Sequence, residues 1–203
     1  MSELTAELRQ RRDAARLGMA VFLSSESMLF GALIAVFFAL RVDSVPAFHE
    51  GARHALLWVG TSGTAVLLAA SALAAAAGEL AGRGRARATA GCLLGAAALG
   101  LVFLGLKLYE YHDHVVHGLV PGGRLAAALQ SFWTLYWVTT GLHALHVLVG
   151  VAVLTSAAAW SVRTEGLGER AHVVENCADY WHLVDAVWLL LWPMFYLMRG
   201  GGP

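Results

Sequence analysis

The sequence predicts an all-α fold, a polytopic membrane bundle of five transmembrane helices, from its composition and from the spacing of its apolar stretches. Of its 203 residues, 58% are hydrophobic and 14% are charged, whereas a soluble domain carries roughly 25% charged residues. A helix needs roughly 20 mostly apolar residues to cross the hydrocarbon. We expect such helices at approximately residues 17–40, 54–77, 88–109, 130–160 and 177–198, within a single membrane domain of residues 1–203.

The polar links between these stretches support the division. The first stretch follows an arginine-rich start, is too long for a signal-peptide core and lacks a small-residue cleavage site, so we interpret it as a span. Pro46 precedes the second stretch, and a Gly/Arg-rich link, residues 78–87, precedes the third. Pro121 and a glycine pair mark a turn before the fourth, and polar residues 161–176 lead to the fifth.

Small residues are dense in the second and third stretches, and Gly91, Gly95, Gly100 and Gly105 recur along the third. Because small residues let helix backbones approach closely in lipid, we expect tight helix packing there. The fourth stretch is longer than a span requires, so it should tilt or project beyond the hydrocarbon.

The distribution of Lys and Arg predicts the orientation. A cytoplasmic N-terminus and an outer C-terminus would put nine of the 14 Lys and Arg residues inside and five outside. Membrane proteins carry an excess of these residues on the cytoplasmic side, which favours this orientation. The outer five would be Arg41, Arg53, Lys107, Arg124 and Arg199.

Charge and cysteine content exclude several functions. The net charge is zero, whereas a nucleic-acid-binding protein shows a basic face. Cys92 and Cys177 lie far apart and form no CxxC motif, so neither a zinc site nor a covalent haem attachment is indicated. We expect both thiols to pack as small apolar side chains.

Glu26 is the clearest polar residue within a predicted span. It lies about nine residues into the first stretch, well inside the hydrocarbon. A charged side chain at that depth costs about 2.5–3.5 kcal/mol on insertion scales, so this one needs a reason. Two interpretations stay open: a neutral acid hydrogen-bonded to a neighbouring helix, and a proton- or lipid-linked site.

Histidines in the fourth and fifth stretches form a second polar group. His143 and His146 are three residues apart and share a helix face, as do His182 and Asp185. Most such groups satisfy one another between helices. A proton relay, or metal or haem ligation across two helices, remains an alternative.

Residues 109–117, which read YEYHDHVVH, are the part of the chain richest in possible metal ligands. They lie where the third stretch meets the outer surface. The alternatives there are a packed interfacial elbow and a metal site.

Four motifs, in order along residues 17–198, resemble the cytochrome c oxidase subunit III family. Ser25-Glu26 with Phe30-Gly31 is similar to that family's third helix, and Tyr109-Glu110-Tyr111 to the end of its fifth. Residues 140–147, TGLHALHV, resemble its sixth helix, and residues 180–188, YWHLVDAVW, its seventh. Glu175 also matches a family position. The resemblance is to the short, five-helix bacterial form, which lacks the first two helices of the seven-helix form; a neighbouring subunit could replace them.

The resemblance implies a non-catalytic accessory subunit of a respiratory haem-copper terminal oxidase. Such a subunit packs on subunit I, and through it reaches subunit II, in the bacterial plasma membrane. It holds no haem, copper or other metal of its own, binds phospholipid, and supports proton uptake and stability during aerobic oxygen reduction. The polar residues to which this lipid-linked, proton-linked or structural role would fall are Glu26, Glu110, His143, His146, Glu175, His182 and Asp185.

Arg163 and Arg170 are expected to lie on the inner side, where they could hold lipid headgroups. The electron donor, cytochrome c or quinol, is not predictable from this subunit.

Competing functions remain at this point. One is a b-type cytochrome or a di-iron enzyme that uses His143, His146 and His182 as ligands. Others are an accessory protein of a quinol oxidase or nitric oxide reductase, and a small transporter, although no internal repeat is evident.

Overall fold

The chain folds into long, roughly parallel and antiparallel helices in a computed structural model that describes residues 2–123 and 125–199. Arg124, one of the five arginines and lysines expected outside, lies beyond the described residues. Within the described ranges there are no strands. The helices are α1 (Ser2–Val42), α2 (Val45–His54), α3 (Leu57–Gly82), α4 (Ala86–Val116), α5 (Ala127–Arg163), the 3₁₀ turn η1 (Leu167–Arg170), α6 (Ala171–Trp192) and the π turn η2 (Pro193–Leu197).

The apolar interior of a membrane explains why these segments are helical. Hydrocarbon offers no water to backbone N–H and C=O groups, so a spanning segment must satisfy them within its own helix. Glycines in the left-handed conformation follow α3 and α4, at Gly84 (φ +69°) and Gly118 (φ +70°), where other residues would be strained. Pro193 begins the π turn that ends α6.

Among the residues that the structure describes, four helices are long and apolar enough to cross a membrane: residues 13–42 of α1, and all of α3, α4 and α5. The fifth expected span, α6, does not meet this measure. Every membrane-length segment of it contains Glu175, Asp179 and Asp185, which lower its hydropathy.

The helices also depart from the expected boundaries. α4 and α5 are longer than predicted, and the expected loop between the first two spans holds the short helix α2. α2 forms because Pro46 suits the first turn of a helix, while Phe48, Gly51 and Ala52 are buried against the bundle.

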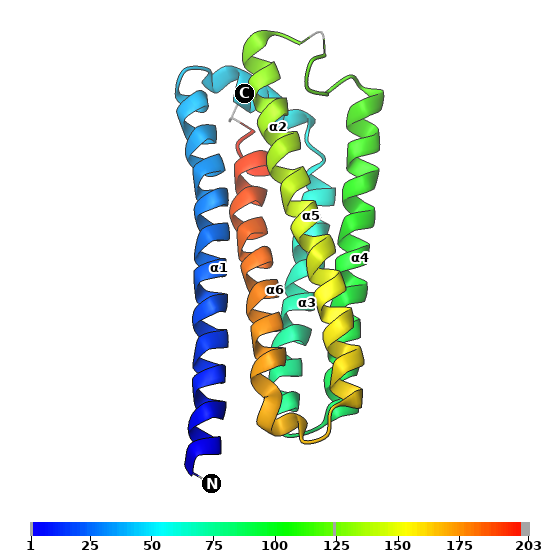
Figure 1. Ribbon diagram of the computed structural model, residues 1–203. Coiled ribbons are helices and arrows are strands. Elements are labelled where there is room, and N and C mark those ends of the chain that lie inside the picture. Colours follow the sequence, from blue (N-terminus) through cyan, green and yellow to red (C-terminus); the bar gives the residue numbers. More distant parts are fainter. Residues whose placement is uncertain (1, 124, 200–203) are drawn as a thin grey trace.

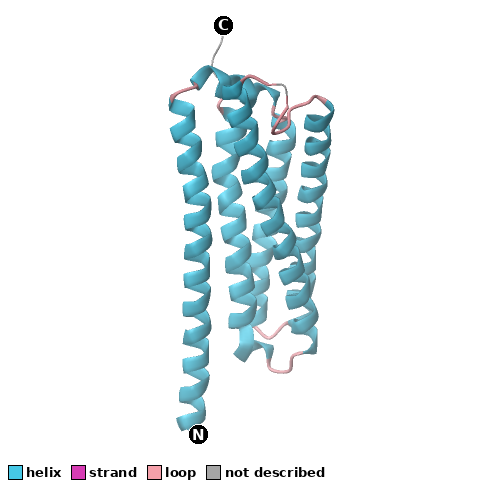
Figure 2. Cartoon of the chain, turned by 45° about the horizontal axis from the view of Figure 1, so that its top comes forward, coloured by secondary structure: helices cyan, strands magenta, loops and turns pink. Residues whose placement is uncertain are grey.

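The long helices run side by side (Figure 1). One end of the bundle, here called the N-terminal end, holds the start of α1 and the α3–α4 and α5–α6 links. The opposite end holds α2 and the α4–α5 link, and both views agree on this arrangement (Figure 2). α3, α4, α5 and α6 make the closest packing, whereas α1 lies at the edge and contacts α5, α6 and α2.

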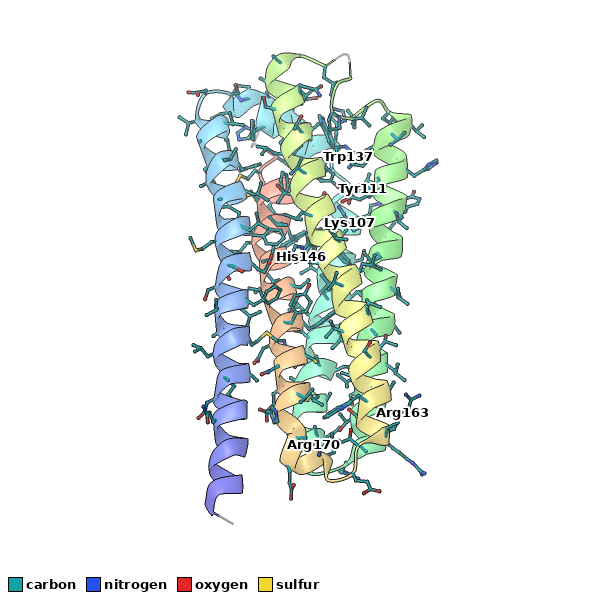
Figure 3. The ribbon with its side chains drawn as sticks, viewed as in Figure 1. Lys107, Tyr111, Trp137, His146, Arg163 and Arg170 are labelled. Carbon is teal, nitrogen blue, oxygen red and sulfur yellow. The ribbon has the colours of Figure 1, made fainter. Side chains whose placement is uncertain are left out.

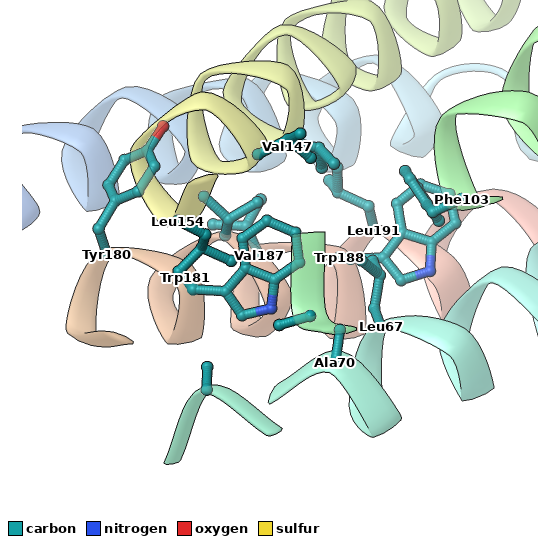
Figure 4. Close-up of a cluster of buried hydrophobic side chains, with 14 of the residues drawn as sticks. Leu67, Ala70, Phe103, Val147, Leu154, Tyr180, Trp181, Val187, Trp188 and Leu191 are labelled. Carbon is teal, nitrogen blue, oxygen red and sulfur yellow. The ribbon is translucent and has the colours of Figure 1, made fainter. Parts of the chain in front are cut away.

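Trp181, Trp188 and Phe103 pack among aliphatic side chains in the core between α3, α4, α5 and α6 (Figure 4). Trp181 is fully buried, and its ring lies against Gly150 of α5 and Gly100 of α4. A Cβ atom would come within 2.8 Å of this ring at Gly150 and within 2.6 Å at Gly100. These two glycines therefore let a large side chain of α6 enter between its neighbours.

Candidate functional site

A buried ion pair lies in the half of the bundle away from the N-terminal end. Lys107 is 2% exposed and Glu110 is 0% exposed, one turn apart on α4. The Lys107 Nζ atom donates to Glu110 Oε2 at 2.7 Å, Tyr136 OH at 2.9 Å and Tyr196 OH at 3.0 Å. An ammonium group has three donors, so this one is fully satisfied by side chains from α4, α5 and η2.

Aromatic rings surround the same ammonium group. The Nζ atom lies 4.9 Å from the ring centres of Tyr111 and Tyr136, and 5.3 Å from that of Trp188. Cations are attracted to ring faces at these distances. Figure 3 shows Lys107 and Tyr111 next to α5. The cluster is closed on all sides, which indicates a structural charge pair.

Sequence reasoning placed Glu110 in the polar core but counted Lys107 among the outer surface charges. The structure buries Lys107 instead. The signal that could have found it is the three-residue spacing from Glu110, which puts both side chains on one helix face. Their tyrosine partners, Tyr136 and Tyr196, come from distant positions that no local pattern reveals.

A second polar pair joins α1 to α5. His146 Nε2 lies 2.9 Å from Glu26 Oε2, and both side chains are less than a fifth exposed. His146 Nδ1 lies 2.8 Å from the Leu142 carbonyl oxygen of its own helix. A carbonyl only accepts, so Nδ1 carries a proton and Nε2 is the atom that faces the Glu26 carboxyl group.

The other predicted histidines have separate neighbours. His143 is buried, stacked on Trp188 at 5.1 Å between ring centres and edge-on to Phe103 at 5.5 Å. His182 Nδ1 lies 2.7 Å from Ser71 Oγ and so joins α6 to α3. Asp185 is buried one turn further along α6. Sequence spacing did not predict Ser71.

Residues 109–117 do not converge on a common point. His114 is buried against Trp133, 4.7 Å between ring centres, whereas His112 and His117 are exposed. Across the described part of the chain, no three His, Cys, Asp or Glu side chains are grouped closely enough to hold a metal ion. The expected interfacial elbow is instead a continuation of α4 to Val116.

Two hollows lie next to α6 near the N-terminal end. The first, about 290 Å³, is lined by Arg16, Met19, Ala20 and Leu23 of α1 and by Glu175, Asn176 and Asp179 of α6. Arg16 Nη2 lies 3.4 Å from Glu175 Oε2 across it.

The second hollow, about 460 Å³, is apolar and lies between α5 and α6. Trp160, Val173 and Cys177 are among the residues that line it. Arg163 and Arg170 are exposed at the same end of the bundle and line neither hollow (Figure 3).

Comparison with known proteins decides the family. The sequence profile of the family described as cytochrome c oxidase subunit III matches residues 6–199. The chain belongs to the cytochrome c oxidase subunit III family. It is therefore an accessory subunit of a haem-copper oxidase and a membrane protein, and the comparisons do not favour a b-type cytochrome or a di-iron enzyme.

Several subunit III relatives are similar over most of their length. The chain is 31% identical to cytochrome c oxidase subunit 3 of Thermostichus vulcanus over 183 residues, 90% of this chain and 86% of the relative. It is 30% identical to that of Synechocystis sp. over 189 residues, 92% and 76% of the two chains. It is also 30% identical, over 198 residues, to the haem-copper oxidase subunit I+III of Aeropyrum pernix, covering 92% of this chain and 23% of the relative.

Proposed function

We propose that this chain is the five-span subunit III of a bacterial respiratory oxidase, a non-redox subunit that packs on subunit I and supports proton uptake and stability during oxygen reduction. The family match over residues 6–199 carries the proposal. The polar residues support it, because they are bonded to one another: Glu26 to His146, Lys107 to Glu110, and His182 to Ser71. Such pairs order a bundle without a cofactor, the haem and copper belonging to partner subunits.

The subunit I partner is supported by a fused relative. In Aeropyrum pernix a single protein carries the name subunit I+III, and the region similar to this chain is 23% of it. Two subunits that occur as one chain are expected to lie together in the assembled complex. We extend this contact to the present chain, with subunit II reached through subunit I.

α6 completes the five spans in this proposal. It runs along the bundle between the neighbouring helices (Figure 1). Of its three acids, one is buried and one has a basic partner. Asp185 is 5% exposed, and Glu175 faces Arg16. Acidic groups within a membrane face the bundle interior or pair with partners, so these residues are compatible with a span.

The proposed orientation puts the N-terminal end on the cytoplasmic side of a bacterial inner membrane. Arg83 and Arg85 of the α3–α4 link, and Arg163 and Arg170 near the α5–α6 link, lie at that end. Removing the buried Lys107 from the outer count strengthens the positive-inside argument.

Deletion of this chain tests the proposed role. Membranes that contain the oxidase without it should begin oxygen reduction at a near-normal rate and lose activity faster during continued turnover, with unchanged haem and copper per subunit I. Restoring the chain should restore the lifetime. Immediate loss of one haem on deletion would instead indicate that the chain holds it.

Phospholipid binding is proposed at the two hollows. Val173 lines the apolar hollow and Asn176 the polar one, and residues three apart are neighbours on a helix face. The hollows therefore meet on α6. An acyl chain fits the apolar hollow, while the guanidinium group of Arg16 fits a phosphate at the polar one. Arg163 and Arg170, which are exposed at the same end of the bundle, are the alternative headgroup site.

Mass spectrometry of lipid bound to the purified complex separates these two headgroup sites. We expect Arg16→Ala to lower tightly bound phospholipid severalfold and the double variant Arg163→Ala/Arg170→Ala to retain it. The reverse pattern would move the headgroup to the α5–α6 link. Full retention in all variants would contradict a headgroup site at these arginines.

A further inference from the structure

Two segments that are far apart in sequence meet at the buried Glu110 carboxylate. Its Oε1 atom accepts the backbone N–H of Leu56, in the link between α2 and α3, at 3.3 Å. Its Oε2 atom accepts the Tyr196 hydroxyl of η2 at 2.7 Å, together with the Lys107 ammonium. One carboxylate thus binds two segments at the same time: residues 45–56, here called the α2–α3 corner, and residues 193–199, here called the C-terminal turn.

The two segments also contact each other directly. Arg199 Nη2 donates to the Ala55 carbonyl oxygen at 2.6 Å, and Arg53 Nε donates to the Arg199 carbonyl oxygen at 3.1 Å. The Tyr196 ring packs on α3, where a Cβ atom at Gly60 would come within 2.8 Å of it. The corner and the C-terminal turn therefore form one layer over the end of the bundle.

Lys107 makes this arrangement depend on the ion pair. Its ammonium group donates to the Tyr196 hydroxyl and holds the charge of Glu110 in place. Hydrogen bonds to charged groups are stronger than those between neutral groups. Removing the Tyr196 hydroxyl, or the charge of Lys107 or Glu110, therefore leaves a buried donor or acceptor with one partner fewer.

We propose that the Lys107–Glu110 pair is a latch that makes the α2–α3 corner and the C-terminal turn open and close as a single unit. Most hydrogen bonds of the pair join it to elements other than α4. An ion pair that stabilised only α4 would not need these bonds. Local opening in proteins follows such cooperative units.

Hydrogen–deuterium exchange of the purified oxidase complex tests the latch. Tyr196→Phe removes one hydroxyl and keeps both buried charges and the ring. We expect exchange to rise about tenfold or more in residues 193–199 and also in residues 45–56, although the substitution lies about 140 positions from that corner in sequence. Tyr180→Phe is the matched control, because its hydroxyl bonds to the His146 carbonyl oxygen elsewhere in the bundle; it should leave both segments unchanged.

The double variant Lys107→Met/Glu110→Gln provides the second measurement. It removes both charges together, so no buried charge is left unpaired, and it should also raise exchange in both segments. Faster exchange confined to residues 193–199 in Tyr196→Phe, with residues 45–56 unchanged, would overturn the proposal. Unchanged exchange at both segments in the double variant would do the same.

Discussion

At the scale of single residues, several buried polar groups in this chain bond to side chains of other helices. Glu26 and His146 come from α1 and α5, and Lys107 and Glu110 reach Tyr136 of α5. In hydrocarbon an unpaired charge is expensive, so these contacts between elements fix how the elements face each other. Glu26, His146 and Glu110 are among the polar residues expected to support the oxidase.

The Lys107–Glu110 pair gives the sharpest residue-scale prediction. Lys107→Met should destabilise the subunit by about 3–5 kcal/mol, because it leaves the Glu110 carboxylate buried and unpaired. Lys107→Met/Glu110→Gln should cost clearly less than that single substitution. Thermal or denaturant unfolding of the detergent-solubilised protein measures both, and equal losses in the two variants would show that the pair carries no buried charge.

Sequence predicted which residues would need partners, but not which partners they would find. The cost of Glu26 in a span and the shared helix faces of the histidines are local properties. Lys107 was misplaced because it lies near the end of an apolar stretch, where lysine side chains usually extend to water. The contacts of Ser71 and Tyr196 depend on how α3 packs against α6 and η2 against α4, which the sequence pattern does not show.

At the scale of elements, glycines decide how closely α4 and α5 approach α6. Gly100 and Gly150 lie against the Trp181 ring, whereas a Cβ atom at Gly105 would contact nothing within 4 Å. The dense glycines of the third stretch therefore serve different purposes, which spacing alone does not distinguish.

Alanine substitutions on α4 should separate these purposes. Gly100→Ala should cost about 1–3 kcal/mol, because the new methyl group overpacks the Trp181 ring. Gly105→Ala on the same helix should be neutral or slightly stabilising, since alanine favours a helix over glycine. Melting temperatures in detergent test this, and equal effects at both positions would contradict the packing described for Trp181.

Four of the five expected helices also meet the apolar requirement for a span, because long apolar runs determine helices in lipid directly. Their ends moved by several residues, since caps and turns depend on single glycines and prolines. α6 was predicted from its motif and aromatic residues, and its three acids show why hydropathy alone does not find it.

At the scale of the whole molecule, the bundle has one arginine-rich end and one end closed by α2 and the C-terminal turn. This asymmetry supports a fixed orientation in the membrane. It also places the two hollows beside α6 on the proposed cytoplasmic side, where anionic headgroups attract basic residues.

Cysteine labelling of intact cells tests that orientation. In a background with Cys92→Ala and Cys177→Ala, a membrane-impermeant maleimide should label Glu50→Cys from outside and label Glu165→Cys only after lysis. Both parent side chains are exposed, Glu50 on α2 and Glu165 in the α5–α6 link. The opposite pattern would invert the topology, and labelling of both from one side would show that α3, α4 and α5, which separate the two positions, do not all span the membrane.

The most direct measurement of the central claim is purification of this chain in mild detergent, with mass spectrometry of the accompanying subunits and a visible spectrum. The account predicts co-purification with a large haem-copper subunit I, with all haem assigned to that partner. A solitary chain with its own haem absorption would contradict it and make His143, His146 and His182 the candidate ligands.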